Sequence, residues 1–194
     1  GLGNKFLANI RNTNAIIHVL RCFENDNITH VDGSIDPVRD KGIIDTELQL
    51  KDLETIENRL AKTQKQAVVG GDKQAKRAVE ILLQYKAVLE QGLSARTVEL
   101  EKEDRKLVAD LNLLTDKPVL YVCNVDEKSA VTGNEHTRAV EAAIADERAE
   151  MLIVAAATEA DIAELDEYEE RQMFLEEIGL KESGVARLIK AAYK

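Results

Sequence analysis

The sequence has no tryptophan, and aromatic residues occupy only 4% of its 194 positions. Charged residues make up 32% and hydrophobic residues 44%, which favours a helix-rich globular protein over a β-sandwich or β-barrel. No apolar run approaches the ~20 residues that a membrane-spanning helix needs, and the first residues lack the basic and apolar regions of a signal peptide. We therefore expect a soluble protein that is not exported and has no membrane partner.

Cysteine and histidine are scarce as well. Cys22 and Cys123 both lie in apolar runs, far apart in the sequence and outside any Cys-x-x-Cys spacing. This placement favours buried, reduced thiols, with redox sensing as the alternative. The three histidines occur in unlike contexts without ligand spacing, so they predict no metal site.

Basic residues are fewer than acidic ones, so the net charge is −10 and the pI is near 4.9. This balance argues against a general attraction to DNA, RNA or an anionic membrane. Residues 62–77 differ, because Asp72 is the only acid there. The basic residues of this stretch are Lys62, Lys65, Lys73, Lys76 and Arg77. They are either a solvated surface or a finger that contacts the phosphates of RNA.

The stretch that is most informative is the apolar run 118–123, which begins at Pro118 and is followed by Asn124, Val125, Asp126 and Glu127. A short apolar run that ends in polar residues is typical of a buried parallel strand. Ligands of open α/β sheets bind beyond the carboxyl ends of the strands. We therefore predict a recognition loop at 124–127.

The pattern Asn-x-x-acid at Asn124 and Glu127 resembles the base-recognition motif of P-loop GTPases, Asn-Lys-x-Asp. Glutamate is one methylene longer than aspartate and cannot place its oxygens at the same point. Adenine also has an acceptor at ring nitrogen 1 where guanine has a donor. A site whose acid no longer matches the donors of guanine loses its preference for that base. We therefore expect relaxed or ATP-leaning specificity. The alternative is a strand end followed by an Asn/Asp turn.

The rest of the chain predicts helices and parallel strands in alternation. We expect a helix at 4–12 with Asn4 as its cap, a strand at 15–23 and a loop at 24–44. Apolar residues recur at three- and four-residue steps over 46–67, where Leu60 belongs to the seam, and over 73–91. Gly70 and Gly71 between these stretches permit a chain reversal and Asp72 suits an N-cap, so we predict an antiparallel helical hairpin. A helix near 101–111 and the strand at 118–123 follow. The remaining elements are a helix at 134–147, a strand at 151–155, an acidic helical region at 159–182 and a last helix from 183 to 193. We expect Ser183 to cap this last helix and Val185, Leu188 and Ile189 to face inward.

These parts, in this order, resemble the Obg-like ATPase family (YchF type) within the P-loop GTPase class. The similarity covers the segments Gly1 to Arg11, Arg21 to Ile28 and Asp36-Pro37, the turn Gly70 to Lys73, the motif Asn124 to Glu127, and Ile162 to Asp166. The resemblance implies a partial P-loop NTPase-like α/β core with a parallel sheet, interrupted by a coiled-coil hairpin. It divides the chain into a first part of the nucleotide-binding domain at 1–45, the helical insertion at 46–112 and a second part at 113–194.

The resemblance also implies roles for single residues. Asn124 would contact the purine, Val125 would lie against the base through its backbone and side chain, and Glu127 would take the acid position. Ala155, Ala156 and Ala157 would form the last base-contacting loop, although Ala157 replaces the lysine that is common in the class. The family is cytoplasmic, uses ATP or GTP with Mg²⁺, and is linked to ribosomes.

The sequence has no Gly-x-x-x-x-Gly-Lys-Ser/Thr and no Asp-x-x-Gly motif, and it does not reach the family's small C-terminal β-rich domain. It therefore has no amide cradle for phosphates and no hydroxyl for Mg²⁺. We interpret it as the middle of a longer protein, an ATP-preferring hydrolase, whose hydrolytic residues this part lacks. The alternative is a non-catalytic module that binds RNA or ribosomes through the hairpin, with nucleotide as a switch.

Overall fold

The computed structural model describes residues 3–24 and 34–192. Gly1, Leu2, Asn25 to Ile28 of the quoted motif and residue 193 of the last predicted helix lie outside the described residues. The chain forms two compact units. The helical unit comprises Gly1–Ile16, Gly42–Pro118 and Asp146–Arg148, and the sheet unit comprises Ile17–Lys41, Val119–Ala145 and Ala149–Lys194.

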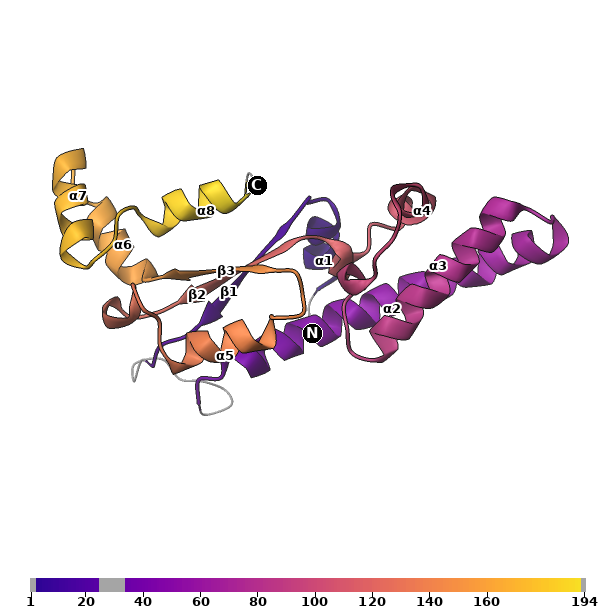
Figure 1. The fold of residues 1–194 in the computed structure, drawn as a ribbon, viewed down its shortest axis with the longest axis horizontal. Coiled ribbons are helices and arrows are strands. Elements are labelled where there is room, and N and C mark those ends of the chain that lie inside the picture. Colours follow the sequence, from indigo (N-terminus) through magenta and orange to yellow (C-terminus); the bar gives the residue numbers. More distant parts are fainter. Residues whose placement is uncertain (1–2, 25–33, 193–194) are drawn as a thin grey trace. The chain divides into compact units, whose positions relative to one another are not determined.

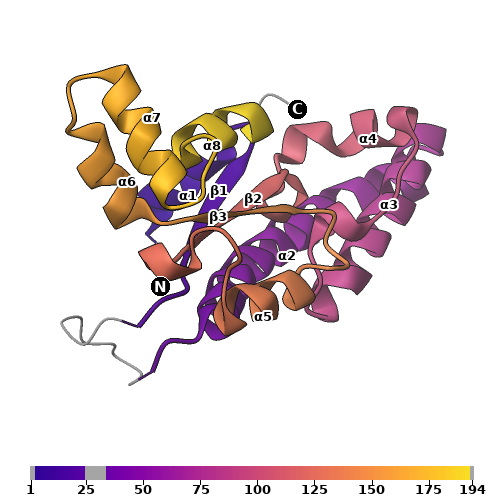
Figure 2. The same cartoon turned by 60° about the vertical axis from the view of Figure 1, so that its left-hand side comes forward.

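The helical unit is built around an antiparallel hairpin, as the periodicity predicts. α2 (Pro37–Val69) lies beside α3 (Lys73–Glu90), and α4 (Lys102–Val108) packs against α3 (Figures 1 and 2). α1 (Asn4–Arg11) belongs to the same unit. The hairpin has a hydrophobic core of its own, formed by side chains of both helices. Its buried side chains include Ile56, Leu60, Ile81, Leu82, Tyr85 and Leu89.

The turn of the hairpin also agrees with the prediction. Gly71 has φ of +60°, a conformation that L-residues with side chains rarely adopt. The carboxylate of Asp72 accepts hydrogen bonds from the backbone N–H groups of Gln74 and Ala75, and it therefore caps α3. Gly92, with φ of +78°, follows the end of α3.

The base of the hairpin is held by a buried carboxylate. Asp52 of α2 is fully buried and accepts hydrogen bonds from Leu114 N at 2.8 Å, Thr115 N at 2.7 Å and Thr115 Oγ1 at 2.7 Å. These donors belong to the 3₁₀ turn Leu114–Asp116, which immediately precedes the central strand of the sheet. Burial raises the pKa of Asp52, although the three hydrogen bonds act in the opposite direction.

The sheet has the order β1-β2-β3, with β1 at Ile16–Arg21, β2 at Val119–Asn124 and β3 at Glu150–Val154. β2 and β3 are parallel and pair Leu120 with Glu150 through to Asn124 with Val154. α5 (Glu135–Ala143) and α8 (Gly184–Ala192) lie on opposite sides of the sheet (Figures 1 and 2). α6 (Ala156–Ala163) and α7 (Tyr168–Glu177) follow β3 at its carboxyl end.

Several predicted details were wrong. The loop predicted at 24–44 is too long, because α2 begins at Pro37, where proline suits the first helical position and Asp36 Oδ1 accepts from Arg39 N at 3.0 Å. Gly3 rather than Asn4 precedes α1, without a side-chain cap. The helix predicted at 134–147 ends at Ala143.

The last helix also departs from its prediction. Ser183 Oγ accepts from Ala186 N at 3.1 Å, as expected of a cap. However, two of the side chains predicted to face inward are largely exposed, Val185 by 62% and Ile189 by 53%. An amphipathic pattern identifies the apolar face of a helix, but it does not say whether this part of the chain covers that face.

Candidate functional site

The carboxyl ends of β2 and β3 bring two separate predicted loops together. Asn124 is paired with Val154 across the sheet, and the N–H of Val125 donates to the carbonyl of Val154 at 2.9 Å. Asn124 Oδ1 then accepts a hydrogen bond from Ala156 N at 3.1 Å. A side chain of the first loop therefore binds the backbone of the second.

This bond determines what the amide of Asn124 can offer to a ligand. Because Oδ1 accepts from Ala156, the amide group is oriented and its Nδ2 remains a donor. Nitrogen 7 of adenine and of guanine is an acceptor, so the donor matches the imidazole side of either purine.

Val125 occupies a different environment from the one predicted. Its side chain is only 3% exposed and belongs to the core cluster that also contains Leu20, Tyr121 and Val140. The side chain is therefore a core residue, and the predicted contact with a base is retained for its backbone alone.

Glu127 is exposed and opens the short 3₁₀ turn Glu127–Ser129 that follows β2. The carbonyls of Asp126 and Glu127 accept the backbone N–H groups of Ser129 and Ala130, which fixes the turn. The backbone is thus positioned by hydrogen bonds while the carboxylate of Glu127 faces solvent.

The three alanines of the second loop differ from one another. Ala155 is buried, and Ala156 and Ala157 are exposed at the first turn of α6. Two small exposed residues at a helix start allow a flat ring to approach the backbone closely.

Asn134 was missed by the sequence analysis. Its Nδ2 donates to the carbonyl of Cys22 at 2.7 Å, just beyond β1, and its Oδ1 accepts from Thr137 N in a reciprocal cap of α5. Asn134 thereby joins the end of β1 to the start of α5. Asn134 itself carried a detectable signal, because asparagine is among the preferred residues at a helix N-cap.

Glu159 was missed as well. It is largely buried in α6, and its two carboxylate oxygens lie 2.7 and 2.8 Å from Gly184 N at the start of α8. A Cβ on Gly184 would lie 2.7 Å from Val154 Cγ1, so a side chain does not fit there. Arg187 Nη2 donates to the carbonyl of Ile153 at 2.7 Å. α8 therefore binds β3 through Ile153, before Ala155 in the sequence, and α6 through Glu159, after it.

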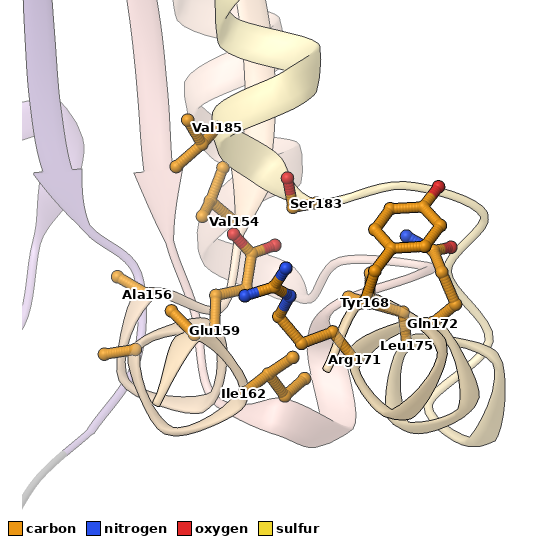
Figure 3. A pocket seen from close by; sticks show the side chains of 12 residues that line it. Val154, Ala156, Glu159, Ile162, Tyr168, Arg171, Gln172, Leu175, Ser183 and Val185 are labelled. Carbon is orange, nitrogen blue, oxygen red and sulfur yellow. The ribbon is translucent and has the colours of Figure 1, made fainter. Parts of the chain in front are cut away.

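A cavity of about 610 Å³ lies beside this second loop (Figure 3). It is mostly apolar, and Arg171 points its guanidinium group into the space between Glu159 and Tyr168. The only predicted base-contacting residue in its wall is Ala156. The wall includes Val154, Ala156, Glu159, Ile162, Leu175 and Val185.

The basic residues of the hairpin tip are all exposed, but they are not equivalent. Arg77 Nη2 lies 2.8 Å from Asp104 Oδ2, and Arg77 Nη1 lies 2.6 Å from Glu80 Oε2. The Arg77 guanidinium lowers the pKa of Asp104. Arg77 therefore forms ion pairs with two acids. Within the described residues, Lys62, Lys65, Lys73 and Lys76 have no ion-pair partner, and these four form what we call the lysine cluster.

The two cysteines are free and fully buried, as predicted, with Cys22 just beyond the end of β1 and Cys123 in β2. A hydrogen bond with Cys123, together with burial, raises the pKa of the Cys22 thiol. Among the described residues, no group of three or more His, Cys, Asp or Glu side chains could hold a metal ion. No described helix has the length and apolarity needed to cross a bilayer.

Comparison with known proteins places this geometry in a family. The chain is 50% identical to the ribosome-binding ATPase YchF of Bacillus subtilis and 46% identical to that of Escherichia coli O157:H7. In both cases the similarity covers 100% of this chain and 53% of the relative, so the chain spans about half the length of these relatives. No family model matches.

A solved structure agrees with the sequence comparison. The YchF GTPase of Schizosaccharomyces pombe superimposes with a TM-score of 0.86 at 29% identity, again over 100% of this chain and 53% of the other. The predicted fold class, a P-loop NTPase-like parallel sheet with helices, is thereby confirmed. By sequence and by fold along its whole length, this chain belongs to the YchF (Obg-like) family of P-loop GTPase-class proteins.

Proposed function

We propose that this chain forms the purine-recognition part of a ribosome-associated, ATP-preferring P-loop nucleotide hydrolase. The observation that carries the proposal is the hydrogen bond between Asn124 Oδ1 and Ala156 N, which joins the two predicted base-contacting loops at the carboxyl edge of the sheet. The names of the relatives, a ribosome-binding ATPase and a GTPase, support the same reaction class and the ribosome as partner.

In this proposal each loop residue has one task. Asn124 donates from Nδ2 to the imidazole side of the purine, and the backbones of Val125, Ala156 and Ala157 border the ring. Glu127 takes the acid position, where its extra methylene relaxes the preference for guanine. The domain boundaries 1–45, 46–112 and 113–194 belong to the same proposal.

The groups that hold phosphates and Mg²⁺ are assigned to the full-length protein, because this sequence lacks the glycine-rich Lys-Ser/Thr motif. Bound Mg²⁺ would neutralise the charge that develops on the transferred phosphoryl group. We accordingly propose that these 194 residues alone do not hydrolyse ATP or GTP. Mg²⁺-dependent phosphate release by the purified 194-residue chain that Asn124→Ala abolishes would contradict this.

The test of base recognition is equilibrium binding of fluorescent ATP and GTP analogues to the full-length protein. Asn124→Ala removes both the base donor and the acceptor for Ala156 N, so we expect affinity for both nucleotides to fall roughly 10- to 100-fold. Asn58→Ala, at an exposed position of α2, is the matched control and should bind as the parent does. Equal affinities of the two variants would refute the base site.

The alternative is a non-catalytic module that binds RNA or ribosomes through the hairpin, with nucleotide as a switch. The lysine cluster at the tip is the observation that favours it. The two proposals differ in turnover. Full-length protein that binds ribosomes and nucleotide, but releases no phosphate over many binding lifetimes, would support the module and contradict the hydrolase.

A further inference from the structure

The hairpin tip exposes two aliphatic side chains that its own fold does not use. Val68 and Val69, the last residues of α2, are 82% and 88% exposed. The residue directly before them, Ala67, is buried, and so is Ala75 in the first turn of α3. Aliphatic side chains this exposed contribute nothing to the packing of the hairpin.

The valines and the lysines share one region of the surface. Residues three, four or seven positions apart lie on the same face of a helix. Lys62, Lys65 and Val69 have this spacing, and Val68 is three positions after Lys65, so the four side chains follow one another along one exposed face of α2. Lys73 and Lys76 are exposed in the first turns of α3, directly after the turn.

Lys73 is unfavourably placed for the helix itself. It is the first residue of α3, where the helix dipole favours negative charge, and the first turn of α3 contains no acid. A cation at this position does not stabilise α3, and neither do the exposed valines. Both features therefore point to something outside the hairpin.

Valine and lysine together distinguish between two kinds of surface. RNA is bound through phosphates, which lysine can contact, and through bases that stack on aromatic rings or guanidinium groups. Valine has neither a flat π face nor a hydrogen-bonding group, so RNA gives it little to bind. A protein with an apolar cleft would bury the valines, and acids around that cleft would complement the lysines.

We propose that the hairpin tip docks into an apolar cleft with an acidic rim on a protein component of the ribosome, with Val68 and Val69 inserted and the lysine cluster at the rim. The proposal rests on the ribosome association proposed above and specifies the contact. The few residues involved predict a small, transient interface rather than a permanent one.

The first experiment measures binding of the full-length protein to purified ribosomes as a function of salt. The Val68→Ser/Val69→Ser double variant should bind at least roughly 10-fold more weakly, mainly through faster dissociation, with an unchanged salt slope. Lys73→Gln/Lys76→Gln should instead slow association and flatten the salt slope. Leu50→Ser, at a 60% exposed position of α2 away from the tip, is the matched control and should bind normally.

The second experiment identifies the partner. A photo-crosslinking amino acid at position 69 should form its adduct with a ribosomal protein. Adducts confined to ribosomal RNA would overturn the proposal in favour of a phosphate-contacting finger. Parent-like binding of the valine variant would overturn it in favour of a solvated tip. If the parent itself does not bind ribosomes, the proposed ribosome association fails, and this contact fails with it.

Discussion

Among the residues that the structure describes, each unit contains one buried carboxylate that accepts main-chain hydrogen bonds, and the two carboxylates differ in how many N–H donors they have. Asp52 in the helical unit has three donors within 2.8 Å and is fully enclosed. Glu159 in the sheet unit has the single N–H of Gly184 and borders a cavity. The carboxylate of the helical unit serves only to fix the backbone, whereas the carboxylate of the sheet unit also forms part of the wall of a cavity.

The largest effect is expected for Asp52→Ala. It leaves two buried N–H groups and a hydroxyl without an acceptor, and each such group costs about 1–3 kcal/mol, so we expect unfolding free energy to fall by more than ~3 kcal/mol. Urea unfolding measures the loss, and amide exchange at Leu114 and Thr115 should accelerate. Glu54→Ala, at an exposed position of the same helix, is the control. A loss no larger than that of the control would mean that Asp52 does not hold the turn.

The same variant predicts a pH dependence. Because burial raises the pKa of Asp52, the folded chain binds this proton more tightly than the unfolded chain does. The contribution of Asp52 is therefore greatest below the unfolded pKa of about 3.9 and decreases as the pH rises through the raised pKa. The difference in unfolding free energy between parent and Asp52→Ala should shrink over that window, and a difference that grows would contradict the assigned cause.

Glu159→Ala should have an intermediate effect. One buried N–H loses its acceptor, so we expect a loss of about 1–3 kcal/mol, concentrated at the start of α8 and visible as faster exchange of the Gly184 amide. Glu159→Gln retains one acceptor oxygen and should lose less. Glu164→Ala, exposed at the end of α6, should change nothing measurable. If Glu159→Ala costs as much as Asp52→Ala, the number of donors does not explain the contrast.

Much of the fold could be predicted because its signals are local. The seam at Leu60, the turn at Gly70 and Gly71 and the cap at Asp72 each depend on residues within a few positions, and all were confirmed. Pro37 also carried a local signal, namely its preference for the first helical position, but the polar loop around it hid the start of α2.

The site was predictable only where it depends on strand order. Asn124 and Ala156 come together because β2 and β3 are parallel neighbours. Other features depend on contacts between elements that are distant in the sequence. They are the burial of Val125, the hydrogen bond between Glu159 and Gly184, and the ion pair between Arg77 and Asp104. No spacing rule reports such contacts, which explains why they were missed.

Glu127 extends the comparison, because its carboxylate has no main-chain donor within the described ranges 3–24 and 34–192. Because it is exposed, Glu127→Asp should leave unfolding unchanged. In the full-length protein this substitution should shift the ATP:GTP affinity ratio toward GTP by about 1 kcal/mol, because the shorter carboxylate is better placed to accept hydrogen bonds from the donors of guanine. Val125→Lys is not combined with it, because Val125 is buried. Competition binding measures the ratio, and Asp126→Glu, a one-methylene change next to it, is the control. An unchanged ratio would show that Glu127 does not contact the base.

The smallest effect on stability is expected for Arg77→Gln, which removes the exposed partner of Asp104. Solvent and salt screen this pair, so the unfolding midpoint should fall slightly at low salt and match that of the parent near 1 M salt.

The informative measurement is an NMR titration of the Asp104 carboxyl. Arg77 lowers the pKa of Asp104, so its stabilising contribution is present above the unfolded pKa and is lost as the pH falls through the lowered value. In Arg77→Gln the pKa of Asp104 should return toward its ordinary value, and in Lys76→Gln, which lacks this contact, it should remain low. An Asp104 pKa that does not respond to Arg77→Gln would place Arg77 with the lysine cluster, as a cation that is available to a partner.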